Sequence, residues 1–122
     1  MIANIEIRSF FRKDLSWYDK STTSDILLQH EQGHFDIAEV FARMMRKEMA
    51  EMDLGDCKKL DLLIKKRYNK VFNKMQEMQE LYDFETEHSQ NRTEQIIWLN
   101  HIKQLLEKYS DYRNQNVVLY HH

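Results

Sequence analysis

The sequence predicts an α+β domain that is predominantly helical, with about three long helices and a short N-terminal strand or hairpin. The 122 residues include no proline and two glycines, a composition typical of long helices joined by few turns. This length is enough for one domain with a modest core, so residues 1–122 are expected to form a single domain. The net charge of −2 gives no electrostatic support for binding nucleic acid.

The segment Ile2–Trp17 is the best candidate for β structure. Ile5 and Ile7 alternate with charged residues there, which is the two-residue period of a strand with one buried face. A lone strand is not stable, so a partner is required. The partner is expected to be Asp14–Tyr18, folded back beside the strand, or to be missing, in which case the domain lacks an N-terminal portion.

The first long helix is expected from the cluster Ser21–Asp25 to about Met52. The hydroxyl groups of the cluster can cap the free N–H groups, and the acidic side chain suits the positive end of the helix dipole. Gly55 follows as a typical stop signal. Along this helix the apolar residues recur at helical spacing, and His30 and His34 lie on or beside the buried stripe.

Two further helices follow. Apolar residues spaced by three, four and seven predict a helix over roughly Asp56–Tyr82. Asn91–Glu94 resembles a capping box, which predicts a third helix from there to about Tyr112. The tail Val117–Tyr120 could add a short strand. No apolar run approaches the roughly 20 residues that a transmembrane helix requires, so no membrane span is expected.

The chemistry of the chain is concentrated in His30–His34, which reads His-Glu-x-x-His. Histidines at positions i and i+4 share one face of a helix, so both rings can bind one Zn²⁺ through nitrogen. Glu31 can then act as the general base toward a water molecule. Gly33 costs a helix interior about 1 kcal/mol relative to alanine and often permits close approach of another backbone. The alternative is a polar helix segment whose histidines bind nothing.

A catalytic zinc site needs a third protein ligand from outside the motif. Asp36 points about 200° away from His34 on an ideal helix. Glu48 lies too far along the same helix. His88 is attractive because its segment lies between two helices and can fold back over the first; the alternative is an exposed loop histidine. The residues considered for this position are Asp36, Glu48, Glu51, Asp53, Asp83, His88 and His101.

Two blocks of the sequence resemble a bacterial family of predicted secreted zinc-dependent proteases. The first is Leu27–Glu39, with Ser16-Trp17 before it and Ala42-Arg43 after it. The second has the form Tyr-Asp-x-x-Thr-x-His and appears as Tyr82–His88, followed by Gln95 and Trp98. The resemblance covers most of residues 5–105.

The resemblance implies that His30, His34 and His88 are the zinc ligands and that Glu31 is the general base. Members of that family usually carry an export signal and a further N-terminal region with strands, which implies a secreted or periplasmic protein. Met1–Phe10 does not have the pattern of a signal peptide.

The expected function is therefore that of a zinc metallopeptidase with a zincin-like fold, acting on a peptide or protein substrate. Tyr82 is a candidate donor to the oxyanion. One alternative is a non-catalytic helical module that binds metal or a protein partner; another is a zinc hydrolase acting on a non-peptide amide. Three protein ligands and an open position favour catalysis, whereas a closed set of four ligands favours the module.

Overall fold

The computed structural model describes residues 2–9, 25–53 and 59–120. These residues form three long α-helices, one short 3₁₀ helix and two strands, which confirms a predominantly helical chain with a small β component. In chain order the elements are β1 (Ile2–Glu6), α1 (Asp25–Glu51), α2 (Leu60–Glu85), α3 (Arg92–Lys108), η4 (Ser110–Tyr112) and β2 (Asn116–Tyr120).

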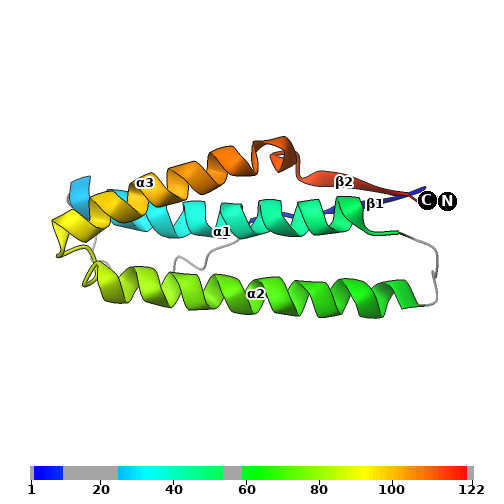
Figure 1. The fold of residues 1–122 in the computed structure, drawn as a ribbon, viewed down its shortest axis with the longest axis horizontal. Helices are drawn as coiled ribbons and strands as arrows, with labels where there is room; N and C mark the ends of the chain where they lie inside the picture. Colours follow the sequence, from blue (N-terminus) through cyan, green and yellow to red (C-terminus); the bar gives the residue numbers. More distant parts are fainter. Residues whose placement is uncertain (1, 10–24, 54–58, 121–122) are drawn as a thin grey trace.

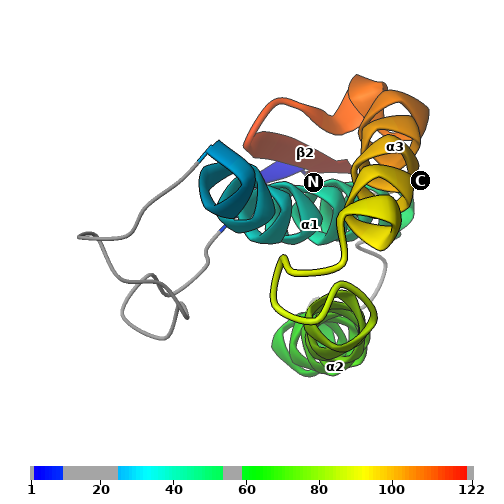
Figure 2. The same ribbon diagram turned by 90° about the vertical axis from the view of Figure 1, so that its left-hand side faces the viewer.

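Helix α1 is the centre of the fold. Helix α2 runs antiparallel beside it, and α3 returns along a different side (Figure 1). The end view in Figure 2 shows α2 and α3 on separate sides of α1. Helix α1 can contact both because its buried residues recur at spacings of three and four. The core shared by the helices comprises Ile37, Val40, Phe41, Met45, Met49, Val71, Tyr82, Trp98 and Ile102, among others.

The two strands join opposite ends of the chain. β1 and β2 pair antiparallel, with Ile2 opposite Tyr120 and Glu6 opposite Asn116. The predicted N-terminal strand and the predicted strand in the tail are thus confirmed. The prediction that the partner is missing is wrong, because pairing across the whole chain leaves no local signal in sequence. The other predicted partner, Asp14–Tyr18, lies outside the described residues.

A buried arginine attaches the strands and η4 to α1. Arg46 is fully buried, and its guanidinium donates to the carbonyl oxygens of Ile7 and Tyr112 at 2.9 Å each. It also donates to Glu39 at 2.9 Å, which balances its charge. A fully buried guanidinium is tolerated only where its donors are satisfied and its charge is paired.

The helix boundaries agree with the predictions to within a few residues. Asn91 caps α3 as predicted, since its side chain accepts a hydrogen bond from the backbone N–H of Glu94 at 3.1 Å. Helix α2 continues three residues past the predicted end at Tyr82. Among the described residues, no helix is long and apolar enough to cross a membrane.

Candidate metal centre

The two motif histidines lie together on the buried face of α1. His30 and His34 are 3% and 4% exposed, and their ring centroids are 5.0 Å apart. This is the one-turn spacing that the sequence predicts for a pair of ligands on one helix. Helix α2 covers this face, so the rings point at α2 rather than into solvent.

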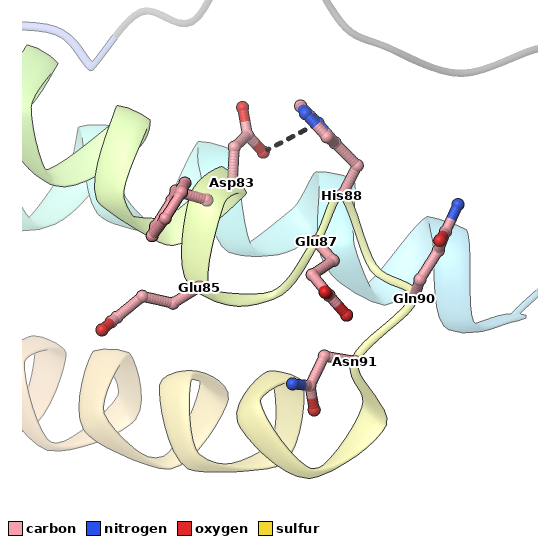
Figure 3. A pocket seen from close by; sticks show the side chains of 7 residues that line it. Asp83, Glu85, Glu87, His88, Gln90 and Asn91 are labelled. Atoms are coloured by element: carbon pink, nitrogen blue, oxygen red, sulfur yellow. Dashed lines mark ion pairs between the residues drawn. The ribbon is translucent and has the colours of Figure 1, made fainter.

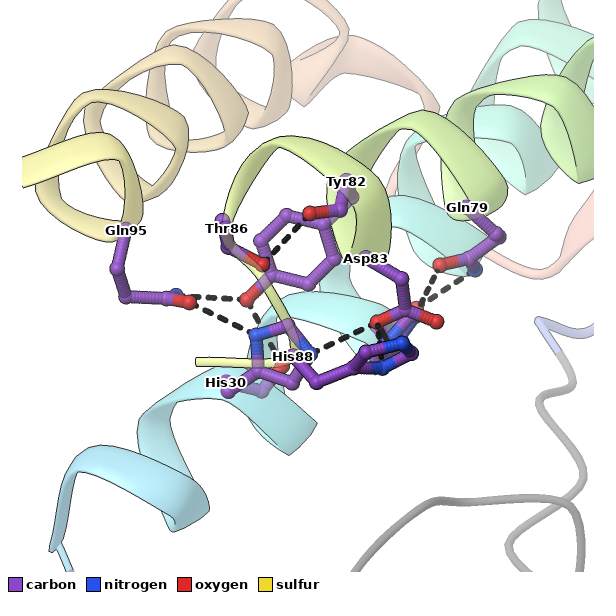
Figure 4. Close-up of polar contacts among 8 residues, drawn as sticks. His30, Gln79, Tyr82, Asp83, Thr86, His88 and Gln95 are labelled. Atoms are coloured by element: carbon purple, nitrogen blue, oxygen red, sulfur yellow. Dashed lines mark hydrogen bonds and ion pairs between the residues drawn. The ribbon is translucent and has the colours of Figure 1, made fainter. Parts of the chain in front are cut away.

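Asp83 completes a compact group with the two histidines. Its Oδ1 atom is 2.8 Å from His30 Nε2 (Figure 4). The same oxygen is 2.6 Å from His34 Nε2. The three potential ligand atoms all lie within 4.8 Å of one another. Asp83 occupies the last turn of α2, so the antiparallel hairpin of α1 and α2 brings together residues about fifty positions apart in sequence.

Asp83 and His34 stabilise each other's charged forms. Burial alone would raise the pKa of Asp83, but hydrogen bonds from His30 and His34 outweigh burial and hold that pKa well below its usual range. Burial alone would lower the pKa of His34, but Asp83 and Gln79 outweigh burial and raise it. Buried groups whose partners oppose desolvation in this way are candidates for a functional site.

Glu31 lies beside the group and is nearly buried. It is 7% exposed, and its Oε2 atom is buried with no hydrogen-bond partner among the described residues. A buried carboxylate oxygen without a partner is costly and calls for a functional reason. The negative charge of Glu31 also acts on His34, where it favours the charged imidazole.

These residues fit a zinc ion. Two imidazole nitrogens and one carboxylate oxygen form one of the ligand sets of catalytic zinc sites. The set converges from two packed helices, and the negative charge of Glu31 also acts on it. The donor atoms of this group are therefore of the types that can hold a metal ion.

His88, the ligand implied by resemblance, lies at the edge of this group. Its Nδ1 is 3.9 Å from Asp83 Oδ1, and its side chain is about half exposed (Figure 3). The three ligands that the resemblance implies, His30, His34 and His88, therefore all lie near Asp83. Asp83 is the one in direct contact with both His30 and His34.

An unusual turn brings His88 back toward α1. Glu87, His88 and Ser89 have φ angles of 50°, 54° and 82°, the left-handed region that non-glycine residues rarely adopt. The backbone N–H of His88 bonds to the carbonyl of Asp83 at 3.0 Å, which ties the turn to the end of α2. Three consecutive left-handed residues are a strained feature next to a candidate site.

A pocket of about 540 Å³ opens beside this turn. Its wall includes Asp83 and His88, so it adjoins the group formed by His30, His34 and Asp83 (Figure 3). Phe84, also in the wall, is 80% exposed. The remaining lining residues are Glu85, Glu87, Gln90 and Asn91.

Three buried residues, Gln79, Gln95 and Tyr82, contact the rings of the two histidines. Gln79 Oε1 is 2.6 Å from His34 Nδ1, and Gln95 Oε1 is 2.7 Å from His30 Nδ1. Tyr82 stacks on the ring of His30 with a centroid distance of 4.5 Å. Sequence reasoning missed Gln79; the available signal was a polar residue on the apolar stripe of α2 between Met75 and Tyr82.

Two predictions about this layer need correction. Tyr82 is fully buried, and its hydroxyl donates to the carbonyl of His30 at 2.8 Å, so its assignment as an oxyanion donor is wrong. Burial also raises the pKa of Tyr82. The close approach at Gly33 comes from this tyrosine side chain rather than from another backbone: an added Cβ would lie 2.7 Å from Tyr82 Cζ.

The other residues considered as a third ligand lie outside the group. Asp36 accepts a hydrogen bond from Gln32 at 3.0 Å, and Glu51 pairs with Lys47 at 2.8 Å. His101 is exposed and makes an edge contact with the ring of Trp98. Neither Glu48 nor Asp53 belongs to the compact ligand group either.

Comparisons with known proteins support the coarser part of the resemblance, a poorly characterised bacterial family. The family described as "Bacterial protein of unknown function (DUF922)" matches residues 13–89, which include both motif histidines, Asp83 and His88. No curated protein and no solved structure matches the chain.

Proposed function

We propose that this chain, which belongs to the bacterial family of unknown function DUF922, is a zinc-dependent hydrolase, specifically a metallopeptidase with a zincin-like site. One observation carries the proposal. The His-Glu-x-x-His histidines converge with Asp83, and the glutamate between them keeps a buried oxygen without a partner among the described residues. This arrangement supplies three metal ligands and a base in one place.

In this proposal His30 and His34 hold the metal through Nε2, and the segment after Tyr82 supplies the third ligand. Zinc bound there would activate a water molecule and polarise the carbonyl group that the water attacks. Burial of both histidines restricts their motion, because each ring is packed against Tyr82. Rigid ligands of this kind keep the geometry that catalysis needs.

Glu31 is the proposed general base. Its Oε2 atom would take a proton from the attacking water and then deliver that proton to the leaving amine nitrogen. A base for this step must not be engaged by another donor, and Oε2 meets that requirement among the described residues.

Two residues can supply the third ligand, and we favour Asp83. Its Oδ1 already lies within 2.8 Å of both histidine nitrogens, whereas His88 Nδ1 is 3.9 Å from Asp83 Oδ1 and the His88 side chain is half exposed. His88 remains the ligand that the family resemblance implies. The pocket with Asp83 and His88 in its wall is the proposed place for the substrate chain.

Zinc binding to single-residue variants tests the ligand set. Stoichiometry and affinity are measured by competition with a chelator for wild type, Asp83→Ala and His88→Ala. If Asp83 is the third ligand, Asp83→Ala loses most affinity and His88→Ala stays near wild type; the reverse result assigns the position to His88. A protein that binds no zinc in wild-type form contradicts the proposal.

Glu31→Gln tests the chemistry separately from the metal. This variant should keep its zinc and lose about 10²–10⁴-fold in kcat on a cleaved peptide from a fluorogenic library. Gln32→Glu, one position along the same helix and exposed, is the matched control and should keep its activity. Hydrolysis that survives Glu31→Gln would remove Glu31 as the base.

A non-catalytic metal module is the second candidate, and the position of His88 is the observation that favours it. If Asp83 and His88 both bind with the two motif histidines, four protein ligands close the site. Cobalt-substituted protein distinguishes the two cases. An absorption spectrum that changes on adding a hydroxamate indicates an open position, and one that does not change indicates the closed module.

A further inference from the structure

We infer that Gln79 and Gln95 are positioning residues that hold His34 and His30 in the tautomer with the proton on Nδ1, leaving both Nε2 atoms as ligand atoms. The inference rests on the proposed metal site and adds how the protein selects the ligating nitrogen. Neutral histidine carries one ring proton and has two possible tautomers, and only an unprotonated nitrogen can bind a metal.

The orientation of the Gln79 amide follows from its second partner. Gln79 Nε2 donates to the backbone carbonyl of His34 at 3.0 Å, and a carbonyl oxygen can only accept. The opposite amide orientation would place two oxygens against each other. Gln79 Oε1 is therefore the atom that lies 2.6 Å from His34 Nδ1, and Nδ1 must donate to it.

The Gln95 amide is oriented through one further step. The Tyr82 hydroxyl has one proton, which it donates to the backbone carbonyl of His30 at 2.8 Å. Its oxygen then accepts from Gln95 Nε2 at 2.7 Å. Gln95 Oε1 is left facing His30 Nδ1 at 2.7 Å, so this nitrogen must also donate.

The consequence appears on the opposite side of both rings. With the proton on Nδ1, His30 Nε2 and His34 Nε2 each present a lone pair to Asp83 Oδ1, which is itself an acceptor (Figure 4). In these neutral rings the three lone pairs repel one another, and the repulsion is relieved by a metal ion among them or by a proton on a ring nitrogen that is then donated to Asp83. The two amides thus determine a site for a positive ion before the ion binds.

Burial of the two glutamines strengthens the preference for the tautomer with the proton on Nδ1. Gln79 and Gln95 are 6% and 3% exposed, so water does not compete well for their amide groups. The side-chain N–H group of each glutamine donates to a buried acceptor. Gln79 donates to the backbone carbonyl of His34, and Gln95 donates to the Tyr82 hydroxyl. Partners of this kind typically change metal affinity by about 10–100-fold when they are removed.

The experiment reads the tautomers directly in the metal-free, full-length chain labelled with ¹⁵N-histidine. Long-range ¹H–¹⁵N correlation spectra, recorded at a pH at which both imidazoles are neutral, distinguish the two tautomers of each ring. Wild type should show the proton on Nδ1 for both His30 and His34. Gln95→Leu should change the tautomer of His30 alone, and Gln79→Leu that of His34 alone.

Zinc affinity provides the second readout. Each leucine variant should bind zinc about 10–100-fold more weakly than wild type. Gln95→Glu, which keeps an acceptor oxygen toward His30, should restore the tautomer and most of the affinity, even if Gln95→Leu does not fold. Gln76→Leu, an exposed position on α2, is the matched control and should change neither readout.

Two outcomes overturn the inference. One is a wild-type spectrum with the proton on Nε2 of either histidine; the other is an unchanged tautomer in a folded leucine variant. Because the tautomers are read without metal or substrate, these results are independent of the proposed hydrolysis. A chain that shows both tautomers as expected and binds no zinc would refute the proposed function and leave the inference standing.

Discussion

The hydroxyl end of Tyr82 fills the space into which a side chain at position 33 would project. A Cβ added to Gly33 would lie 2.7 Å from Tyr82 Cζ, closer than real Cβ contacts allow. The Tyr82 ring lies close to α1 at this position because its hydroxyl donates to the backbone carbonyl of His30, which is on α1 like Gly33. The glycine inside the His-Glu-x-x-His motif is therefore part of the packing that holds the histidines.

Gly33→Ala should destabilise the protein although alanine is the better helix former. Helix propensity alone predicts a gain of about 1 kcal/mol, whereas overpacking against a buried ring costs about 1–3 kcal/mol. Urea denaturation with circular dichroism measures the sign. Gln32→Ala, an exposed neighbour, should change stability by less than about 0.5 kcal/mol. A stabilised Gly33→Ala would contradict the close contact with Tyr82.

Zinc should raise the thermal stability of the chain, because its proposed ligands come from two different helices. A ligand that binds only the folded state at a free concentration 100 times its Kd stabilises it by about 2.7 kcal/mol. Differential scanning calorimetry should show a higher Tm with zinc and its reversal by a chelator. His34→Ala should abolish the shift, and a shift that persists in that variant would point to a different site.

Glu39→Gln should weaken the protein at neutral pH and much less in acid. Burial alone would raise the pKa of Glu39, but hydrogen bonds and charge from Arg46 and Arg43 outweigh it and lower the pKa. The stabilisation is therefore present above the ordinary pKa of 4.5 and is lost as pH falls through the lower pKa of the folded state.

Urea denaturation across this range tests the Glu39 prediction. At pH 7 the substitution should cost about 1–3 kcal/mol, because the fully buried Arg46 loses its ionised partner. The difference from wild type should shrink as the pH is lowered below 4.5. A difference that does not depend on pH would show that the ion pair contributes little.

Ser89→Gly should stabilise the turn that carries His88. Ser89 has a φ of 82°, and a left-handed conformation costs a non-glycine residue roughly 1–2 kcal/mol. After the extra chain entropy of glycine is subtracted, a net gain of about 0.5 kcal/mol is expected in chemical denaturation. Glu80→Gly on the exposed side of α2 is the control and should cost about 1 kcal/mol. A loss at both positions would contradict strain at Ser89.

The helices and the motif were predictable because their signals are local. Asn91 caps α3, and His30 and His34 share a face, as their spacing in sequence requires. Asp83 is one of the candidates that the sequence offers for the third ligand, whereas the resemblance implies His88; the structure places Asp83 in the last turn of α2. The break between Tyr82 and Asn91 was predictable, but the left-handed turn within it contains no glycine, so nothing in the sequence indicated its conformation.

The buried glutamines that contact the two histidines were harder to predict for a different reason. Gln79 and Gln95 contact the histidines across distances of 45 and 65 positions in sequence. Such contacts depend on how three helices pack, which periodicity does not specify. The pairing of β1 with β2 is also a contact between distant parts of the chain, so it was not predictable for the same reason.

That pairing has a kinetic consequence. The two strands close a loop of nearly the whole chain, so their contact has the largest entropic cost of closure in the fold. We expect the strands to join after the helices have packed, and to separate first during partial opening. The start of α1 and the end of α2 lie at the opposite end of the helices from the strands (Figure 1). Amide hydrogen exchange should therefore report early opening of the sheet while the ends of α1 and α2 that hold the histidines and Asp83 stay protected.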